Sequence, residues 1–280
     1  MKMRLRDASL AAIAVAAIGG LGMNTASAAI AYDQNVTPNV IFGSGNANGG
    51  FTVDQNTGQH VELGLRGKLR FDSNNQAQSI YNSDGAGNYS FATGTPNLGI
   101  AHPGWATTTT PIWNFDWSIN TNFDDTGSFV VGDLFYQMGI DFDPGLGTNY
   151  LIIDPINVPF ADHSFGDNLT GANAGAEAGN STVYASYLTH YIVAQNSVNY
   201  EFVNDGPFSG FDPNANGTYN IFLAAYTDAN HTNQLARTSI NVVVGAGAPP
   251  AVPIPGAVLL FGSGLGMLGF AGRKKFLKKA

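Results

Sequence analysis

Apolar and polar residues alternate along several stretches in the middle of the chain, and this period of two residues predicts β-strands with one buried face. The clearest stretches are residues 61–71, 112–119, 129–142, 149–153, 198–202, 219–225 and 240–244. In 112–119 four large apolar side chains, those of Trp113, Phe115, Trp117 and Ile119, share one face. We therefore expect them in the core of a sheet and not on an open sugar-binding surface.

The stretch 61–71 differs from the others because its polar face is basic. Arg66, Lys68 and Arg70 alternate there with apolar residues. Charged side chains are typical of a solvated strand face, and they also protect a sheet edge from pairing with another chain. We therefore expect these three side chains in water, with a ligand site on them as the weaker alternative.

A single helical pattern lies among the strands, over residues 181–195. Tyr184 and Leu188 stand four residues apart within it, the spacing of one helix face, and Asn180 or Ser181 can cap its start. Packed against a sheet, this helix would close one end of the fold.

Two long stretches, 29–58 and 155–181, are rich in Asn and Gly and offer little apolar surface. We expect them to be loops, with one short strand at 39–42. Strands separated by turns, one short helix and no alternation of strands with helices predict a mainly β fold. The fold class is a β-sandwich, of which a jelly roll is one form.

The chain opens with the features of an export signal. Its basic residues are Lys2, Arg4 and Arg6. An uncharged segment, 10–23, follows, and Ala26 and Ala28 then form an A-x-A cleavage site. We expect a signal peptide over 1–28 that the Sec translocon and signal peptidase process, so that the mature chain begins at Ala29.

The other end of the chain predicts a transmembrane helix. Residues 256–272 carry no charge, and as a helix they are about 26 Å long, just short of a hydrocarbon core about 30 Å thick. Arg273, Lys274 and Lys275 follow immediately. Basic residues at the end of such a helix stay in the cytoplasm, so the chain before it would be outside.

A short motif precedes this helix, formed by Val252, Pro253, Ile254, Pro255 and Gly256. A Pro-x-Pro motif, a glycine-rich transmembrane helix and a basic end resemble, in that order, the PEP-CTERM sorting signal of Gram-negative bacteria. With Ile254 where Glu is usual, the motif looks like the VPLPA-type variant. The resemblance covers about residues 252–279. It implies an exosortase-type membrane protease as partner, a transient stay in the inner membrane and release to the cell surface or medium. The alternative is an ordinary anchor that is never cut.

These features divide the chain into a signal peptide (1–28), an exported domain (29–244), a Gly/Ala/Pro linker (245–251) and a sorting tail (252–280). The domain keeps four basic residues against 19 acidic ones, a net charge of about −15. Such a surface repels phosphate backbones, which excludes nucleic acid as a partner. Because the chain has no cysteine, disulfides and thiolate sites are excluded as well.

One turn matches half of a calcium-binding motif. Asp212, Asn214 and Asn216 follow the spacing D-x-N-x-N-G, but the twelfth position is Leu223 where a bidentate Glu is required. A plain Asn-Gly turn is the favoured interpretation, and a calcium site of another kind is the alternative. No other cofactor is expected.

Two further places carry candidate chemistry. Asp162, His163 and Ser164 are an acid, a base and a nucleophile by type, but no G-x-S-x-G motif surrounds the serine, and neighbouring side chains rarely face one another. Catalysis is therefore not expected there. Trp105 lies in a stretch without strand pattern and is the better candidate for a ligand contact.

The favoured function is that of a non-catalytic protein of the cell surface or of an extracellular, biofilm-type matrix, which binds exopolysaccharide and cations weakly. One alternative is a secreted glycan hydrolase or lyase. It would draw on aspartates or on the exported glutamates Glu62, Glu177 and Glu201, which no sequence spacing pairs. Another is a calcium-dependent carbohydrate-binding module, which would need a defined pocket with an exposed aromatic side chain.

Overall fold

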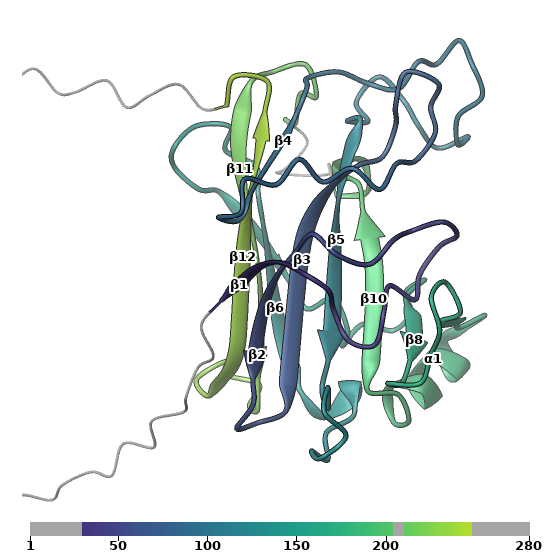
Figure 1. The fold of residues 1–280 in the computed structure, drawn as a ribbon, viewed down its shortest axis with the longest axis vertical. Coiled ribbons are helices and arrows are strands. Elements are labelled where there is room, and N and C mark those ends of the chain that lie inside the picture. Colours follow the sequence, from purple (N-terminus) through teal and green to yellow (C-terminus); the bar gives the residue numbers. More distant parts are fainter. Residues whose placement is uncertain (1–29, 204–209, 248–280) are drawn as a thin grey trace, which may run out of the picture.

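The computed structural model describes residues 30–203 and 210–247. They form two β-sheets and one α-helix, a mainly β fold consistent with the predicted sandwich (Figure 1). The predicted signal peptide, transmembrane helix and sorting motif lie outside the described residues. Within the described ranges, none of the helices has the length and apolar character needed to cross a bilayer.

The larger sheet has seven strands in the order β1-β2-β3-β5-β10-β8-β9. They are β1 (Ala31–Gln34), β2 (Phe51–Asn56), β3 (Val61–Leu69), β5 (Trp113–Asn120), β10 (Val193–Val198), β8 (Ser164–Gly166) and β9 (Ala176–Glu177). The smaller sheet has five strands in the order β4-β12-β11-β6-β7. They are β4 (Asn88–Phe91), β12 (Gln234–Val244), β11 (Gly217–Tyr226), β6 (Phe135–Asp141) and β7 (Tyr150–Ile153). Neighbouring strands are antiparallel, except for β4 and β12, which are parallel.

The apolar core lies between the two sheets. The four large apolar side chains of β5 are all buried and belong to one cluster with Leu223 on β11 and Ile240 on β12. The prediction that they form core is confirmed. The strands predicted at 219–225 and 240–244 are also present, as β11 and β12, and pair in register from Gly217 opposite Val244.

The predicted helix is present but shorter than its pattern. α1 covers Ser181–Leu188, and the Asn180 side chain caps it by accepting a hydrogen bond from the backbone N–H of Val183, with a distance of 3.0 Å. From Val193 the chain instead forms β10, which pairs with β5 on one side and β8 on the other. The gain of backbone hydrogen bonds on both edges explains why strand replaces helix there.

Three other expectations need correction. The predicted strand 198–202 is mostly a 3₁₀ turn, Tyr200–Phe202, because the Asn199 side chain accepts a hydrogen bond from the backbone of Glu201. The strand expected over 129–142 begins only at Phe135, after a 3₁₀ turn at Val131–Asp133. The stretch 155–181 is not all loop, since it contributes β8 and β9 to the edge of the larger sheet.

The loop prediction for 29–58 is wrong in the most consequential way. β1 and β2 lie within it, and residues 39–42 are not a strand. The segment between β1 and β2, residues 35–50, is called the strap here because it crosses the outer face of the larger sheet, in front of β3, β5 and β10 (Figure 1). Its apolar residues Val36, Val40 and Phe42 are buried with Phe51 and Val53 in a second small core.

Backbone groups of the strap bind polar side chains of the sheet beneath it. The Thr37 N–H donates to Glu62 Oε1 at 2.7 Å, and the Ile41 N–H donates to Gln195 Oε1 at 2.8 Å. The Asn120 side-chain amide donates to the Thr37 carbonyl at 3.0 Å. The face of the sheet that alternation predicts to be wet is therefore a second buried layer.

Candidate functional site

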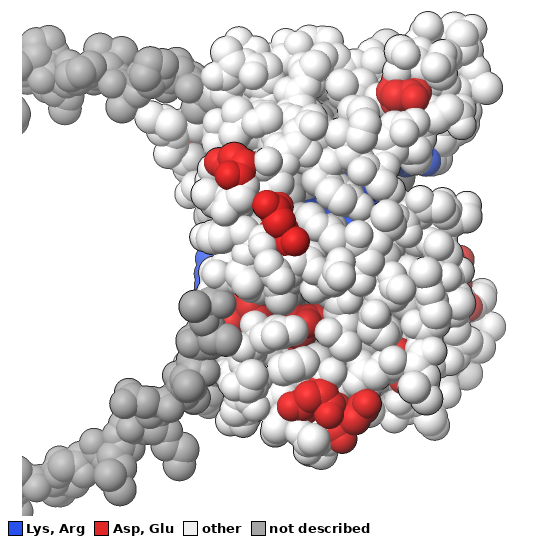
Figure 2. All heavy atoms as spheres, viewed as in Figure 1, with Lys and Arg blue, Asp and Glu red and all other residues white. Residues whose placement is uncertain are grey.

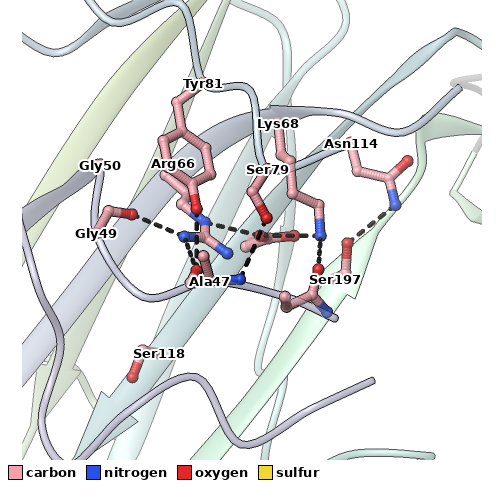
Figure 3. Close-up of polar contacts among 12 residues, drawn as sticks. Ala47, Gly49, Gly50, Arg66, Lys68, Ser79, Tyr81, Asn114, Ser118 and Ser197 are labelled. Carbon is pink, nitrogen blue, oxygen red and sulfur yellow. Dashed lines mark hydrogen bonds and ion pairs between the residues drawn. The ribbon is translucent and has the colours of Figure 1, made fainter. Parts of the chain in front are cut away.

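A cluster of buried charges lies under the strap (Figure 3). Arg66 Nε donates to Asp116 Oδ2 at 2.8 Å, and Lys68 Nζ lies 3.4 Å from the same oxygen. The side chains of Arg66 and Asp116 are 0% exposed, and that of Lys68 is 3% exposed. The expectation that the basic face of this strand lies in water is therefore wrong for Arg66 and Lys68, and Arg70 is itself partly buried.

The strap supplies the acceptors that allow this burial. Arg66 Nη1 donates to the backbone carbonyls of Ala47 and Gly49, at 2.9 Å and 2.7 Å, and Lys68 Nζ donates to Asn46 Oδ1 at 2.6 Å. The Arg66 guanidinium also lies 4.2 Å from the ring centroid of Phe51. Paired and hydrogen-bonded in this way, charges can be buried at tolerable cost.

The electrostatics of the cluster follow from this arrangement. Burial acts to raise the pKa of Asp116, but the positive charges of Lys68 and Arg66 outweigh it, and the pKa is lowered. The pKa of Lys68 is lowered because burial disfavours its charged form, an effect that the charge of Asp116 only partly opposes. The cluster thus contains more positive than negative charge.

Beside the cluster, a groove of about 550 Å³ crosses the outer face of the larger sheet. We call it the Trp105 groove. Five strands contribute polar residues to it, namely Lys68, Asn114, Ser197, Ser164 and Glu177. The strap borders it at Asn46. Figure 2 shows a notch on the right of the molecule, between the strap and the loops above it.

Trp105 lies at this groove, so the structure places the predicted ligand residue at a cavity. Its ring packs against Phe202, with centroids 4.7 Å apart, and against Phe71, at 6.0 Å. Yet 36% of Trp105 remains exposed. An indole held by two other rings and open to solvent is a rigid, amphipathic platform for another ring.

A second, apolar pocket of about 500 Å³ adjoins the groove. The two share Asp162, Asn196, Ser197 and Phe202. Phe160 and Phe202 border the apolar pocket and are 48% and 55% exposed. The surface here combines a polar groove with aromatic side chains, as binding sites for amphipathic ligands do.

Asp162, His163 and Ser164 do not form a catalytic triad. Because side chains alternate at this strand, Asp162 and Ser164 line the groove, whereas His163 is buried against Trp117, with ring centroids 4.9 Å apart. His163 Nδ1 lies 3.1 Å from the hydroxyl of Tyr184. Burial lowers the pKa of His163 to about 4, so it is neutral at pH 7.

The half calcium motif forms a closed turn just before β11. Asp212 Oδ1 accepts hydrogen bonds from the backbone N–H of Asn214, at 2.9 Å, and from its side-chain amide, at 3.3 Å. Asn216 Oδ1 instead accepts from the backbone of Ala246 at 3.3 Å. Both oxygens thus already accept hydrogen bonds within the protein. Across the described ranges, no group of three or more His, Asp or Glu side chains could hold a metal ion. The calcium site stays a prediction.

The sequence placed a ligand site on Lys68 and Arg70 only as the weaker alternative, whereas both line the groove. The signal that pointed to them was present, since three of the four basic residues of the predicted exported domain lie on one strand. What was missing was the strap, which turns that strand face into the floor of a groove.

Comparison with protein-family models, with curated proteins and with solved structures gives no match.

Proposed function

We propose that the chain is an exported protein of the cell surface or extracellular matrix that binds polysaccharide in the Trp105 groove without catalysis. The observation that carries this proposal is the exposed Trp105 ring, held by Phe71 and Phe202 at the edge of a polar groove. Sugar rings offer an apolar face for stacking and hydroxyl groups for hydrogen bonds. The groove offers the Trp105 ring for the apolar face of a sugar, and Asn and Ser side chains on its floor for the hydroxyl groups.

The position of the chain ends supports display of this groove. The described part begins at Ile30 and ends at Gly247, and both ends lie on the left of Figure 1, beside β1 and β12. The groove lies toward the other edge, over β5, β10 and β8. A domain attached through its ends would therefore keep the groove open to its surroundings.

The jelly-roll form of the sandwich is also part of this proposal.

The binding proposal is tested by replacing Trp105 with alanine. We expect binding to the host's exopolysaccharide, measured by affinity electrophoresis, to weaken about fivefold, because stacking on an aromatic ring contributes on the order of 1 kcal/mol. Leu169→Ala is the control, since Leu169 is also apolar, is 92% exposed and lies outside the groove. Equal binding by both variants and the wild type would contradict a role for the groove.

The same assay addresses the hydrolytic alternative. Of the three glutamates, Glu62 is buried beneath the strap, and Glu201 accepts hydrogen bonds from Thr107 and Thr109. Only Glu177 lines the groove, together with Asp162. A pair of carboxylates in a groove is what glycoside hydrolysis needs, so this observation keeps the alternative as a second candidate. Release of new reducing ends during incubation would favour it over the binding proposal.

The export part of the proposal concerns the tail. Residues 253–255 carry Pro-x-Pro, which keeps the backbone extended and accessible before the predicted membrane helix. We expect an exosortase-bearing host to cut near Pro255 and release the domain. In the same host, a variant without 253–255 should remain full-length in the membrane fraction. Recovery of peptides containing Phe276 from the surface fraction of the wild type, by mass spectrometry, would show a permanent anchor.

A further inference from the structure

We infer that the Trp105 groove selects an anionic polysaccharide, with the acidic group of one sugar seated at Lys68 and Arg70 while its ring stacks on Trp105. This inference rests on the proposed function and specifies the ligand class. The shared chemistry is a sugar ring that carries a carboxylate or a sulfate.

The β3 end of the groove carries more positive than negative charge. Arg66, Lys68 and Arg70 come from this one strand and the residue after it, and Asp116 is the carboxylate that pairs with the first two. Arg66 and Lys68 share its Oδ2 oxygen. The Arg70 guanidinium makes no hydrogen bond or ion pair with another residue in the described ranges. Three cations therefore face one carboxylate, in a protein that is acidic overall.

Burial makes this imbalance costly. Lys68 has three N–H donors, and the contacts to Asn46 and Asp116 account for two. Arg66 Nη2 is also buried without a hydrogen-bond partner in the described part of the chain. Positive charge in a partly dehydrated floor is stabilised by an anion far more than a solvated charge would be. Lys68 and Arg70 both line the groove, so an anion in the groove can reach them.

The groove also contains two carboxylates, Asp162 and Glu177, which would repel an anion. The strand order separates them from the cations. Asp162 lies just before β8 and Glu177 is on β9, three and four strands away from β3. At about 4.8 Å per strand this is about 14–19 Å, beyond the Debye length of about 8 Å at physiological salt. The anionic group of the ligand is thus directed to the β3 end of the groove. The end at β8 and β9 suits the uncharged hydroxyl groups of the sugar.

The aromatic platform adjoins the cationic end. Arg70 lies 4.8 Å from the ring centroid of Phe71, and Phe71 in turn packs against Trp105. A ring stacked on Trp105 is therefore close to Arg70. This arrangement fits a single acidic sugar better than a separate neutral sugar and free anion.

The test compares matched oligosaccharides by isothermal titration calorimetry in the presence of a chelator. The probes are tetragalacturonate, its neutral methyl ester and a sulfated galactan tetrasaccharide. We expect the wild-type protein to bind tetragalacturonate or the sulfated probe at least about tenfold more tightly than the methyl ester. We also expect this preference to weaken as salt is raised. The acidic probe that binds more tightly shows whether the groove prefers a carboxylate or a sulfate.

Two variants assign the preference to the β3 end. Arg70→Met should reduce the ratio between the acidic and methyl-ester affinities toward one. The control Arg237→Met removes the fourth basic residue of the domain, on β12 of the other sheet over the Phe222 ring, and should leave the ratio as it is. Arg70 is partly exposed, and melting curves of both variants check that they are folded.

The outcomes separate this inference from the proposed function. Equal affinity for the methyl ester and the acidic probes overturns the anionic preference and leaves polysaccharide binding intact. A preference that survives Arg70→Met overturns its assignment to this end of the groove. Failure of all probes and of the host polysaccharide to bind overturns the proposed function itself.

Discussion

Replacing Asp116 with asparagine is expected to lower the free energy of unfolding by about 3–5 kcal/mol, because it leaves a buried group of cations without a counter-charge. Asn is nearly the same size as Asp, so the loss would come from charge and not from a cavity. Arg66 and Lys68 both contact Asp116 Oδ2, and all three side chains are at most 3% exposed. Urea unfolding followed by circular dichroism gives the measurement.

The matched control is Asp162→Asn, the same change at an exposed aspartate of the same sheet face. It should alter the free energy of unfolding by no more than about 0.5 kcal/mol. Adding Lys68→Met to Asp116→Asn should recover part of the loss, since it removes one uncompensated cation. A midpoint for Asp116→Asn that equals that of the wild type would mean that water or relaxation of the strap compensates the charges.

Replacing Trp113 with alanine is expected to cost about 3–5 kcal/mol by a different mechanism, the loss of a large buried side chain and the cavity that it leaves. Trp113 is 0% exposed. Its ring contacts Tyr200, with centroids 4.9 Å apart, as well as Phe91 and Tyr219 from the opposite sheet. It therefore joins the two sheets at one end of the core.

Trp105→Ala is the natural control for this variant, because it deletes the same side chain at an exposed site. It should weaken polysaccharide binding, as predicted above, with a much smaller change in urea midpoint. The loss of stability for Trp113→Phe should lie between those of Trp105→Ala and Trp113→Ala. Phenylalanine keeps a ring in the core, and the indole N–H that it removes has no hydrogen-bond partner within the described ranges. A Trp105→Ala variant as unstable as Trp113→Ala would show that Trp105 serves the fold and not a ligand.

The sequence predicted the inner layer of the fold well. The alternation in 112–119 and 219–225 places apolar side chains on one face, and burying that face against another sheet is the dominant gain in folding. Strands β5, β11 and β12 follow directly from it. The helix was predicted too long because the period of 181–195 describes local geometry. The last three residues of that pattern, 193–195, belong instead to β10, and its pairing with β5 and β8 depends on strands far away in the chain.

The strap shows why the candidate site was only partly predicted. Residues 35–50 have few apolar side chains, so composition favours a solvated loop. Their stability on the sheet comes from pairs such as Thr37 with Glu62 and Ile41 with Gln195, which are 25 and 154 residues apart. No local pattern contains such pairs. The same is true of Arg66, whose acceptors include the carbonyls of Ala47 and Gly49.

By itself, the sequence determined which side chains must leave water: the apolar faces of β3, β5, β11 and β12 are set by the two-residue period of a strand. It also singled out Trp105 as an aromatic residue outside any strand pattern. The tertiary structure alone decided that the basic face of β3 is buried and that Lys68, Arg70 and Trp105 meet at one groove. The physical reason is that burial of a charge depends on the acceptors that other segments bring to it, and those acceptors are set by the path of the strap and not by the strand's own residues.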